Sequence, residues 1–249
     1  MPTAKGWIIS TIELELVISI RQTDRPTDMD TLVALQLLVW GTEAVPAHQL
    51  IATARNGGCV FVAESQGEIL GFCYGFSAGE YLFSHLLVVH PKARGQGLGR
   101  RLKLAQLAWA REQNFAELRW TFDPLRVTNA RLNLNLPGTT VAAYYKNYYG
   151  TMADSLNEGD TDRLEVRWAT SEVSPVERVN VVPLLREGKV EPPRTRGTWV
   201  SLSLPSEYPM GADKQAWLTK LRAAFRWAFE AGYRGVEFTS EGYLLRPWS

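Results

Sequence analysis

The sequence has few cysteines, almost no net charge and no long apolar run. Only two cysteines occur in 249 residues, and neither Cys59 nor Cys73 belongs to a CxxC pair, so a disulfide framework and a zinc site are not expected. Twenty-seven basic residues oppose 26 acidic ones, which leaves no excess of positive charge for a nucleic-acid backbone. No uncharged run reaches the length of a signal-peptide core or a membrane span. We therefore expect a cytoplasmic protein with no metal, no nucleic-acid partner and no membrane partner.

Hydrophobic residues make up 45% of the chain, which is enough for a packed core. Apolar spacing and turn residues predict a mixed α/β domain over residues 1–170. The expected strands are 14–21, 59–64, 69–76, 81–89, 117–122, 141–149 and 164–169. The expected helices are 31–40, a short one after Pro46, 98–113 and 128–136. In the helix 98–113 an apolar stripe predicts the buried face, and Arg100, Arg101, Lys103 and Arg111 are expected to lie off it.

The last third of the chain predicts a C-terminal extension over residues 171–249. Residues 170–198 lack clear periodicity and are expected to form a connecting arm. After it we expect a strand at 200–204, an amphipathic helix at 213–231 and a strand at 235–239. This extension has no recognisable motif; it is expected to cap an acceptor pocket or to form the interface of a homodimer.

The most informative segment is HPKARGQGLGRRL, from His90 to Leu102. It joins a mostly apolar strand to the strongest helix, with Gly95, Gly97 and Gly99 at the start of that helix. Glycines let backbone N–H groups approach a ligand, and a helix N-terminus attracts anions. A P-loop would need Gly-Lys-Ser/Thr, and a dinucleotide fingerprint would need glycine where Arg100 stands, so neither applies.

The pattern Arg94-x-x-Gly97-x-Gly99 resembles the R/Q-x-x-G-x-G/A signature of the GCN5-related N-acetyltransferase (GNAT) superfamily. Four further segments are similar to a bacterial branch of it: Ser84-His85, WTFDPL (120–125), NARLNL (129–134) and YYKNYYG (144–150). The resemblance covers residues 15–169. It implies a mixed, mostly antiparallel central sheet flanked by helices, in which the strands ending at Val89 and near Phe122 splay apart.

The resemblance also implies a cofactor, acetyl-CoA or another short-chain acyl-CoA, whose diphosphate the glycine loop holds. The pantetheine arm would pair with backbone groups near Leu87 and Val89. The implied cofactor-binding residues are Leu87, Val88, Val89, Arg94, Gly95, Gln96, Gly97, Leu98, Gly99, Arg100 and Asn129. Asn129 has a second interpretation as a helix cap. Many family members carry a tyrosine acid four residues before the glycine that ends the last helix; Leu134 stands there in this chain and cannot donate a proton.

Acyl transfer to an amine needs a base, and His85 is the first candidate. A histidine titrates near neutrality, and strand alternation predicts that His85 projects from the same face as Leu87 and Val89. A hydrogen-bonded core histidine is the alternative. Asp123 is the second candidate, although a turn-forming role before Pro124 also explains it.

The remaining candidates surround the acceptor. Tyr145, with Tyr144 and Tyr148, could replace the missing acid or line the acceptor pocket, although strand aromatics often serve packing. Arg126 and Arg131 could recognise a carboxylate, or simply be solvated.

The sequence thus predicts an acyl-CoA-dependent N-acyltransferase that moves an acetyl or other short acyl group to the primary amine of a small molecule or amino acid. The alternative is a non-catalytic acyl-CoA sensor or interaction module. A G-x-S-x-G match at residues 75–79 is set aside, because the residues after it predict a strand, whereas a serine hydrolase needs a helix there.

Overall fold

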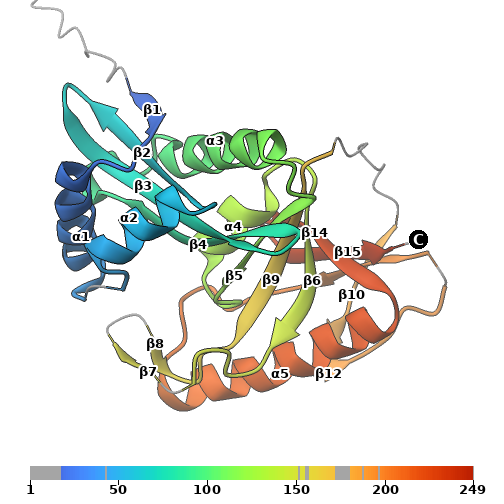
Figure 1. Ribbon diagram of the computed structural model, residues 1–249. Coiled ribbons are helices and arrows are strands. Elements are labelled where there is room, and N and C mark those ends of the chain that lie inside the picture. The colour runs from blue at the N-terminus through green and yellow to red at the C-terminus, as the bar shows by residue number, and fades with distance from the viewer. Residues whose placement is uncertain are drawn as a thin grey trace, which may run out of the picture.

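The computed structural model describes residues 18–42, 44–150, 152–154, 157–171, 180–186, 188–195 and 197–248. An 11-stranded sheet runs through the molecule in the order β1-β2-β3-β4-β5-β9-β6-β14-β15-β13-β10 (Figure 1). Its strands are β1 (Ser19–Gln22), β2 (Cys59–Ser65), β3 (Glu68–Ala78), β4 (Tyr81–Val89), β5 (Glu117–Phe122), β6 (Thr139–Tyr145), β9 (Arg163–Ala169), β10 (Val181–Pro183), β13 (Trp199–Leu202), β14 (Tyr233–Thr239) and β15 (Gly242–Pro247). Two short hairpins, β7 (Met152–Asp154) with β8 (Asn157–Gly159) and β11 (Leu185–Arg186) with β12 (Lys189–Val190), lie outside it. The mixed fold and the mostly antiparallel sheet are confirmed.

Two helices cover one face of the first strands. Helix α1 (Pro26–Trp40) and helix α2 (Ala47–Arg55) pack on β2, β3 and β4 (Figure 1). Helix α1 begins five residues before the expected start at Thr31, because Pro26 already has the backbone conformation of a first helical residue. It ends where predicted, at Gly41, whose φ of 73° is left-handed. The part of the expected first strand before residue 18 lies outside the described residues.

Helices α3 (Leu98–Glu112), α4 (Val127–Leu134) and α5 (Gly211–Glu230) contribute to the larger hydrophobic cluster, which lies on the other face of β4. Helix α3 packs against β2, β3 and β4 there, and α5 packs against β6 and β14. Ser77 lies inside β3, and the chain turns at Gly79 into β4, so the G-x-S-x-G match is a hairpin. Among the described residues no helix is both long and apolar enough to cross a membrane.

Strands β4 and β5 run parallel but remain paired only at their beginnings. The paired residues are Tyr81 with Glu117, Leu82 with Leu118 and Phe83 with Arg119. Beyond Phe83, β4 continues to Val89 beside β3 alone. The expected divergence of the two strands is therefore confirmed, and its apex lies just after Phe83.

The C-terminal residues continue the same sheet instead of forming a separate layer. Strand β14 pairs with β6 through Gly235 and Val141, and β15 and β13 follow outward. Strand β15 was not expected, since its short apolar run near Pro247 gave no alternation to read. The expected connecting arm contains β10, which pairs in parallel with β13, so the prediction of an irregular arm was wrong at that point. Residues 172–179 of the arm lie outside the described residues.

Candidate active site at the divergence of two strands

The glycine loop gives α3 an open N-terminus. Gly95 and Gly97 have φ values of 78° and 74°, which favour glycine, and a Cβ on either would meet nothing within 4 Å. Gly97 is the N-cap residue of α3, and no side chain caps the helix. The first-turn N–H groups of Leu98, Gly99 and Arg100 have no acceptor within the helix. These donors and the positive end of the helix dipole therefore form a site for an anion.

Basic side chains surround this loop. Arg94 and Arg100 are exposed, and within the described residues neither forms an ion pair. Arg101 instead donates to the carbonyl of Ile18, 2.5 Å away. Gln96 is exposed, and its side chain reaches the carbonyl of Lys92. The loop thus offers positive charge that no carboxylate of the described chain neutralises.

Gly99 brings the helix close to its neighbours. A Cβ at Gly99 would lie 3.3 Å from a methyl of Leu132 on α4 and 3.4 Å from one of Leu87 on β4. The missing side chain therefore lets α3, α4 and β4 meet at the mouth of the divergence.

The free edge of β4 presents backbone groups toward β5. The N–H of His90 donates to the carbonyl of Leu70 on β3 at 2.8 Å. Because successive residues of a strand point their N–H and C=O groups to opposite edges, those of Leu87 and Val89 point away from β3. Strand β5 does not pair with them, and they remain available for an extended ligand. Val88 points back to β3, and its side chain is buried under α1 and α2.

His85 does not share a face with Leu87 and Val89, and that prediction was wrong. The pairing between β3 and β4 shifts between Tyr74–Leu86 and Gly75–Ser84, so His85 is the extra residue of a β-bulge. The bulge reverses the alternation: Leu87 and Val89 pack against the cluster around α3, whereas His85 lies on the face covered by α1 and α2. A single inserted residue changes the face of every later side chain.

The environment of His85 is aromatic. Its ring lies 5.8 to 6.1 Å, between ring centroids, from Tyr74, Phe76 and Phe83. Its Nδ1 is buried without a hydrogen-bond partner, and Nε2 is not among the buried unpaired atoms. Burial lowers the pKa of His85 below that of an ordinary histidine. The imidazole is therefore neutral near pH 7, the form that accepts a proton, and the alternative of a hydrogen-bonded core histidine does not fit it.

Asp123 has both carboxylate oxygens engaged. Oδ1 accepts from the backbone N–H of Leu125 at 2.9 Å, and Oδ2 accepts from the hydroxyl of Tyr208 at 2.7 Å. Arg126 lies 3.7 Å from Oδ2 and stacks on the ring of Tyr208. These contacts favour the turn-forming interpretation of Asp123. The bond from Tyr208 also connects this turn to the C-terminal residues.

The tyrosines of β6 donate to carboxylates. Tyr145 donates to Glu165 at 2.9 Å, and burial together with that bond raises its pKa to about 12. Tyr144 donates to Asp162 at 2.6 Å, so its hydroxyl is not free to donate to a leaving group. Tyr148 has no such bond within the described residues and is 42% exposed.

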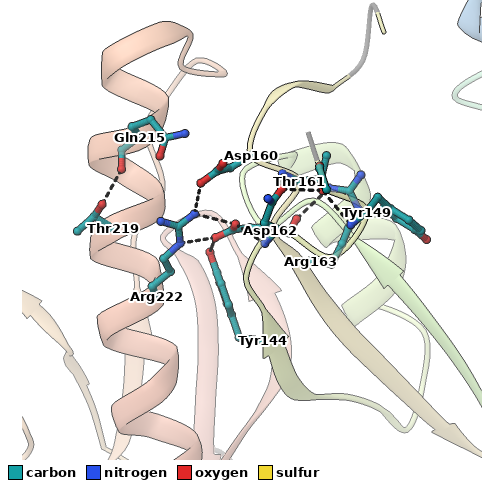
Figure 2. Close-up of polar contacts among 11 residues, drawn as sticks. Tyr144, Tyr149, Asp160, Thr161, Asp162, Arg163, Gln215, Thr219 and Arg222 are labelled. Carbon is teal, nitrogen blue, oxygen red and sulfur yellow. Dashed lines mark hydrogen bonds and ion pairs between the residues drawn. The ribbon is translucent and has the colours of Figure 1, made fainter. Parts of the chain in front are cut away.

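Asp162 connects this strand to the C-terminal helix. Arg222 of α5 reaches both of its oxygens, at 2.7 and 2.8 Å, and also binds Asp160 (Figure 2). Burial acts to raise the pKa of Asp162, but hydrogen bonds from Arg222 and Tyr144 outweigh it and lower the pKa. Figure 2 shows Arg222 pointing from α5 toward the loop before β9. The arrangement anchors the extension to the sheet, and sequence spacing gave no signal for it.

Two predictions fall on α4. Asn129 is exposed and is not the cap, because Arg126 holds the N-cap position. Leu134 is buried, so the family's usual acid is absent from this position in space as well as in sequence. Arg131 is exposed.

Sequence reasoning missed the burial of Lys103. It was expected off the apolar stripe of α3, yet it is 2% exposed and lies beneath the apex of the divergence. Gln106, one turn further along α3, is also fully buried. In the sequence, Lys103 and Gln106 lie three residues apart beside the apolar stripe, and this spacing could have indicated a buried polar pair. The same spacing is also typical of a solvated helix face.

A cleft of about 360 Å³ lies elsewhere, between β6 and α5, lined by Ala142, Ala143, Tyr144, Lys146, Arg222, Arg226, Phe229 and Glu230. None of the residues of the glycine loop lines this cleft. Among the described residues no group of three or more His, Cys, Asp or Glu side chains could hold a metal ion.

Comparisons with known proteins agree with this fold. Residues 56–148 match the family described as Acetyltransferase (GNAT) domain. The fold is similar to the ribosomal-protein-S18-alanine N-acetyltransferase from Escherichia coli, at 18% identity and a TM-score of 0.52 over 64% of this chain and 97% of that one. It is also similar to Ard1 from Thermoplasma volcanium (20% identity, TM-score 0.52, 63% and 100% of the two chains). A third similar structure is yncA from Salmonella typhimurium, solved with acetyl-CoA (19% identity, TM-score 0.51, 64% and 98%). A search of curated proteins found no match.

Residues 56–148 therefore carry a GNAT acetyltransferase domain. The family match covers the strands β2 to β6, which contain the glycine loop and the divergence of β4 from β5.

Proposed function

We propose that this protein transfers an acetyl or other short acyl group from CoA to the primary amine of a small molecule or amino acid. The observation that carries the proposal is the uncapped N-terminus of α3, which follows two left-handed glycines at the mouth of the β4–β5 divergence. A diphosphate fits such a cluster of N–H donors. The acetyl-CoA in the similar yncA structure supports the choice of ligand.

The cofactor would be held along one line. Residues 94–100 would bind the diphosphate through backbone N–H groups and the charges of Arg94 and Arg100. The free groups of Leu87 and Val89 would pair with the amides of the pantetheine arm, as a further strand would. Asn129, exposed on α4, would contact the arm from the other side. The N–H groups at the free edge of β4 would then stabilise the oxyanion of the tetrahedral intermediate.

His85 would be the base on the acceptor side. Because the bulge turns it to the face opposite Leu87 and Val89, it would approach the thioester from the side opposite the α3 cluster. An amine near pKa ~10 must lose a proton before it attacks, and a neutral imidazole accepts one near pH 7. Tyr145 would line the acceptor side together with Glu165. Asp123 would position the turn after β5.

The other parts of the assignment follow from this function. We propose that the protein acts in the cytoplasm without a metal, that the acetyltransferase domain ends near residue 170, and that the extension 171–249 closes the acceptor side or forms a homodimer. The contacts of Arg222 with Asp162 and of Tyr208 with Asp123 support a fixed position for the extension.

A pair of glycine variants tests the cofactor site. Gly97→Val places a branched side chain beside the first-turn amides, and we expect CoA to bind at least tenfold more weakly. Gly79→Val is the matched control: Gly79 has a φ of 75° and equally open space in the β3–β4 turn, so it carries the same backbone strain at the opposite end of β4 from the loop. Calorimetric titration with CoA measures both, and equal affinities would contradict the proposed site.

Turnover separates an enzyme from a sensor. We expect acyl-CoA and an amine panel to release free CoA, measured with a thiol reagent. Tight CoA binding without release across the panel would instead support the non-catalytic alternative, which the absence of an acid at Leu134 favours.

A further inference from the structure

We propose that Lys103, acting through Ser84, holds positive charge for the departing CoA thiolate and thereby takes over the task of the tyrosine acid that is absent at Leu134. The inference rests on the proposed function, because it needs the thioester to lie at the apex of the β4–β5 divergence. Lys103 is a positioning residue in this proposal, since it acts through the hydroxyl of Ser84.

The position of the pair is set by the strand pairing. The last paired residues are Phe83 of β4 and Arg119 of β5, so Ser84 and Trp120 are the first residues beyond the apex. The Nζ of Lys103 lies 2.7 Å from the hydroxyl oxygen of Ser84 and 3.7 Å from the ring centre of Trp120. The ammonium therefore bridges the two strands where they begin to separate.

The free edge of β4 between the glycine loop and this apex has a length that suits an extended pantetheine arm. Val89 lies five positions after Ser84, and a strand rises about 3.3 Å per residue, so the free edge spans roughly 16 Å. An extended pantetheine arm that begins at the α3 N-terminus and follows this edge ends near Ser84. The sulfur of the thioester would then lie beside the Lys103–Ser84 pair.

No ion pair among the described residues explains why a lysine is buried at this position. Within the described residues no carboxylate forms an ion pair with it. The titratable groups that face it are the thiols of Cys59 on β2 and Cys73 on β3, and burial raises the pKa of both, so they stay neutral. Its other neighbours are polar but neutral: Ser84, Gln106 of α3 and, through Trp120, Asn133 of α4. A methionine of similar size would pack here without the cost of burying an amine.

The surroundings prepare this lysine to change its charge. Burial lowers its pKa to about 7, so the side chain passes between ammonium and amine near neutral pH. The hydroxyl of Ser84 accepts from the ammonium of Lys103 and donates to the side-chain oxygen of Gln106. A hydroxyl can turn its O–H to another acceptor while it continues to accept from the lysine.

The chemical step balances without a further reactant. The amine nitrogen forms a bond to the carbonyl carbon and gives one proton to the base on the acceptor side. The bond between carbon and sulfur breaks, and sulfur keeps the electron pair. Ser84 turns its O–H to the thiolate and accepts from the ammonium of Lys103, so the negative charge is stabilised and no proton has to leave the lysine.

The affinities of CoA and desulfo-CoA test the pair without any acceptor. The two ligands differ only in the thiol, so their affinity ratio reports how the protein treats the sulfur. If Lys103 and the thiolate form an ion pair, the pairing releases a proton below about pH 7 and takes one up above the thiol pKa of about 8.5. Plotted against pH, the ratio of the affinity for CoA to that for desulfo-CoA is therefore expected to form a bell with its maximum between these pH values. At the maximum the ratio rises about tenfold for each unit by which the protein lowers the pKa of the thiol.

The variants make the test specific. Lys103→Met is expected to bind both ligands but to lose the bell, and Ser84→Ala is expected to lower its height. Lys189→Met, which changes an exposed lysine on β12, is the matched control and should keep the wild-type profile. If Lys103→Met does not fold, Ser84→Ala carries the same test, because it removes the hydroxyl and leaves the lysine.

Each result decides something. A ratio independent of pH in the wild-type protein, or a bell that persists in Lys103→Met, overturns the inference and leaves the proposed function standing. Failure of both ligands to bind overturns the proposed function and the inference with it. Acylation of Lys103 itself, detected by intact mass after incubation with acetyl-CoA, also overturns the inference, because a positioning ammonium is not a nucleophile.

Discussion

A basic side chain lies against each face of β4, half-buried on one and fully buried on the other, and the two surroundings differ. On the face covered by α1 and α2, His85 lies among aromatic rings with an unpaired Nδ1. On the face covered by α3, Lys103 lies in a polar network with Ser84 and Gln106. Burial lowers the pKa of both. The difference teaches that one bulge can leave a neutral imidazole and a buried amine on opposite faces of the same strand.

The largest effect is expected on the face covered by α1 and α2. His85→Ala should lower kcat by about 10²-fold or more, the usual contribution of a general base. Its lowered pKa keeps the imidazole neutral at lower pH than an ordinary histidine, so the acid limb of kcat in the wild-type protein should fall below pH ~6.5. A pH series of initial rates measures both. His48→Ala, at an exposed position on α2, serves as the control, and unchanged turnover of His85→Ala across the series would remove the base from this face.

The lysine on the face covered by α3 should affect how the free energy of unfolding depends on pH. The folded lysine titrates at about 7 and the unfolded one at 10.5, so the unfolded chain binds more protons between these values. Stability should therefore rise with pH in this window, by at most about 1.4 kcal/mol per unit, and Lys103→Met should remove that part of the slope. Urea unfolding at several pH values measures it. If the free energy of unfolding varied with pH equally in the variant and the wild-type protein, the lowered pKa of Lys103 would be contradicted.

Ser84 should matter less than the lysine that it contacts. Ser84→Ala removes the partner of both Lys103 and Gln106 and should cost about 1–3 kcal/mol of unfolding free energy. In the double variant with Lys103→Met the two effects should not add, because the residues share one network. Additive losses in the double-mutant cycle would separate them.

The smallest effect is expected at Tyr145. Tyr145→Phe removes its hydrogen bond to Glu165 and should change stability by about 0.5–1.5 kcal/mol, with turnover changed no more than a few-fold. A loss of turnover comparable to that of His85→Ala would instead give the phenol the role of acid, and would weaken the contrast between the two faces.

Much of the fold was predictable because it depends on local patterns. The hairpin of β2 and β3, the helix α3 and the stop at Gly41 follow from alternation, from amphipathic spacing and from glycine at positive φ. Strand β15 and the pairing of β10 with β13 were not predictable, since they depend on partners far along the chain. The glycine loop was recognisable for a local reason as well: its glycines and the helix after them are consecutive.

The sequence by itself determined the element order from β2 to β6 and the glycine loop that opens α3, because turn geometry and helix termini are properties of neighbouring residues. Only the tertiary structure decided which way His85 points, that Lys103 is buried, and that Arg222 ties the extension to Asp162. A bulge is a property of two strands in register, burial depends on what packs from across the sheet, and an ion pair needs two groups brought together by the whole fold.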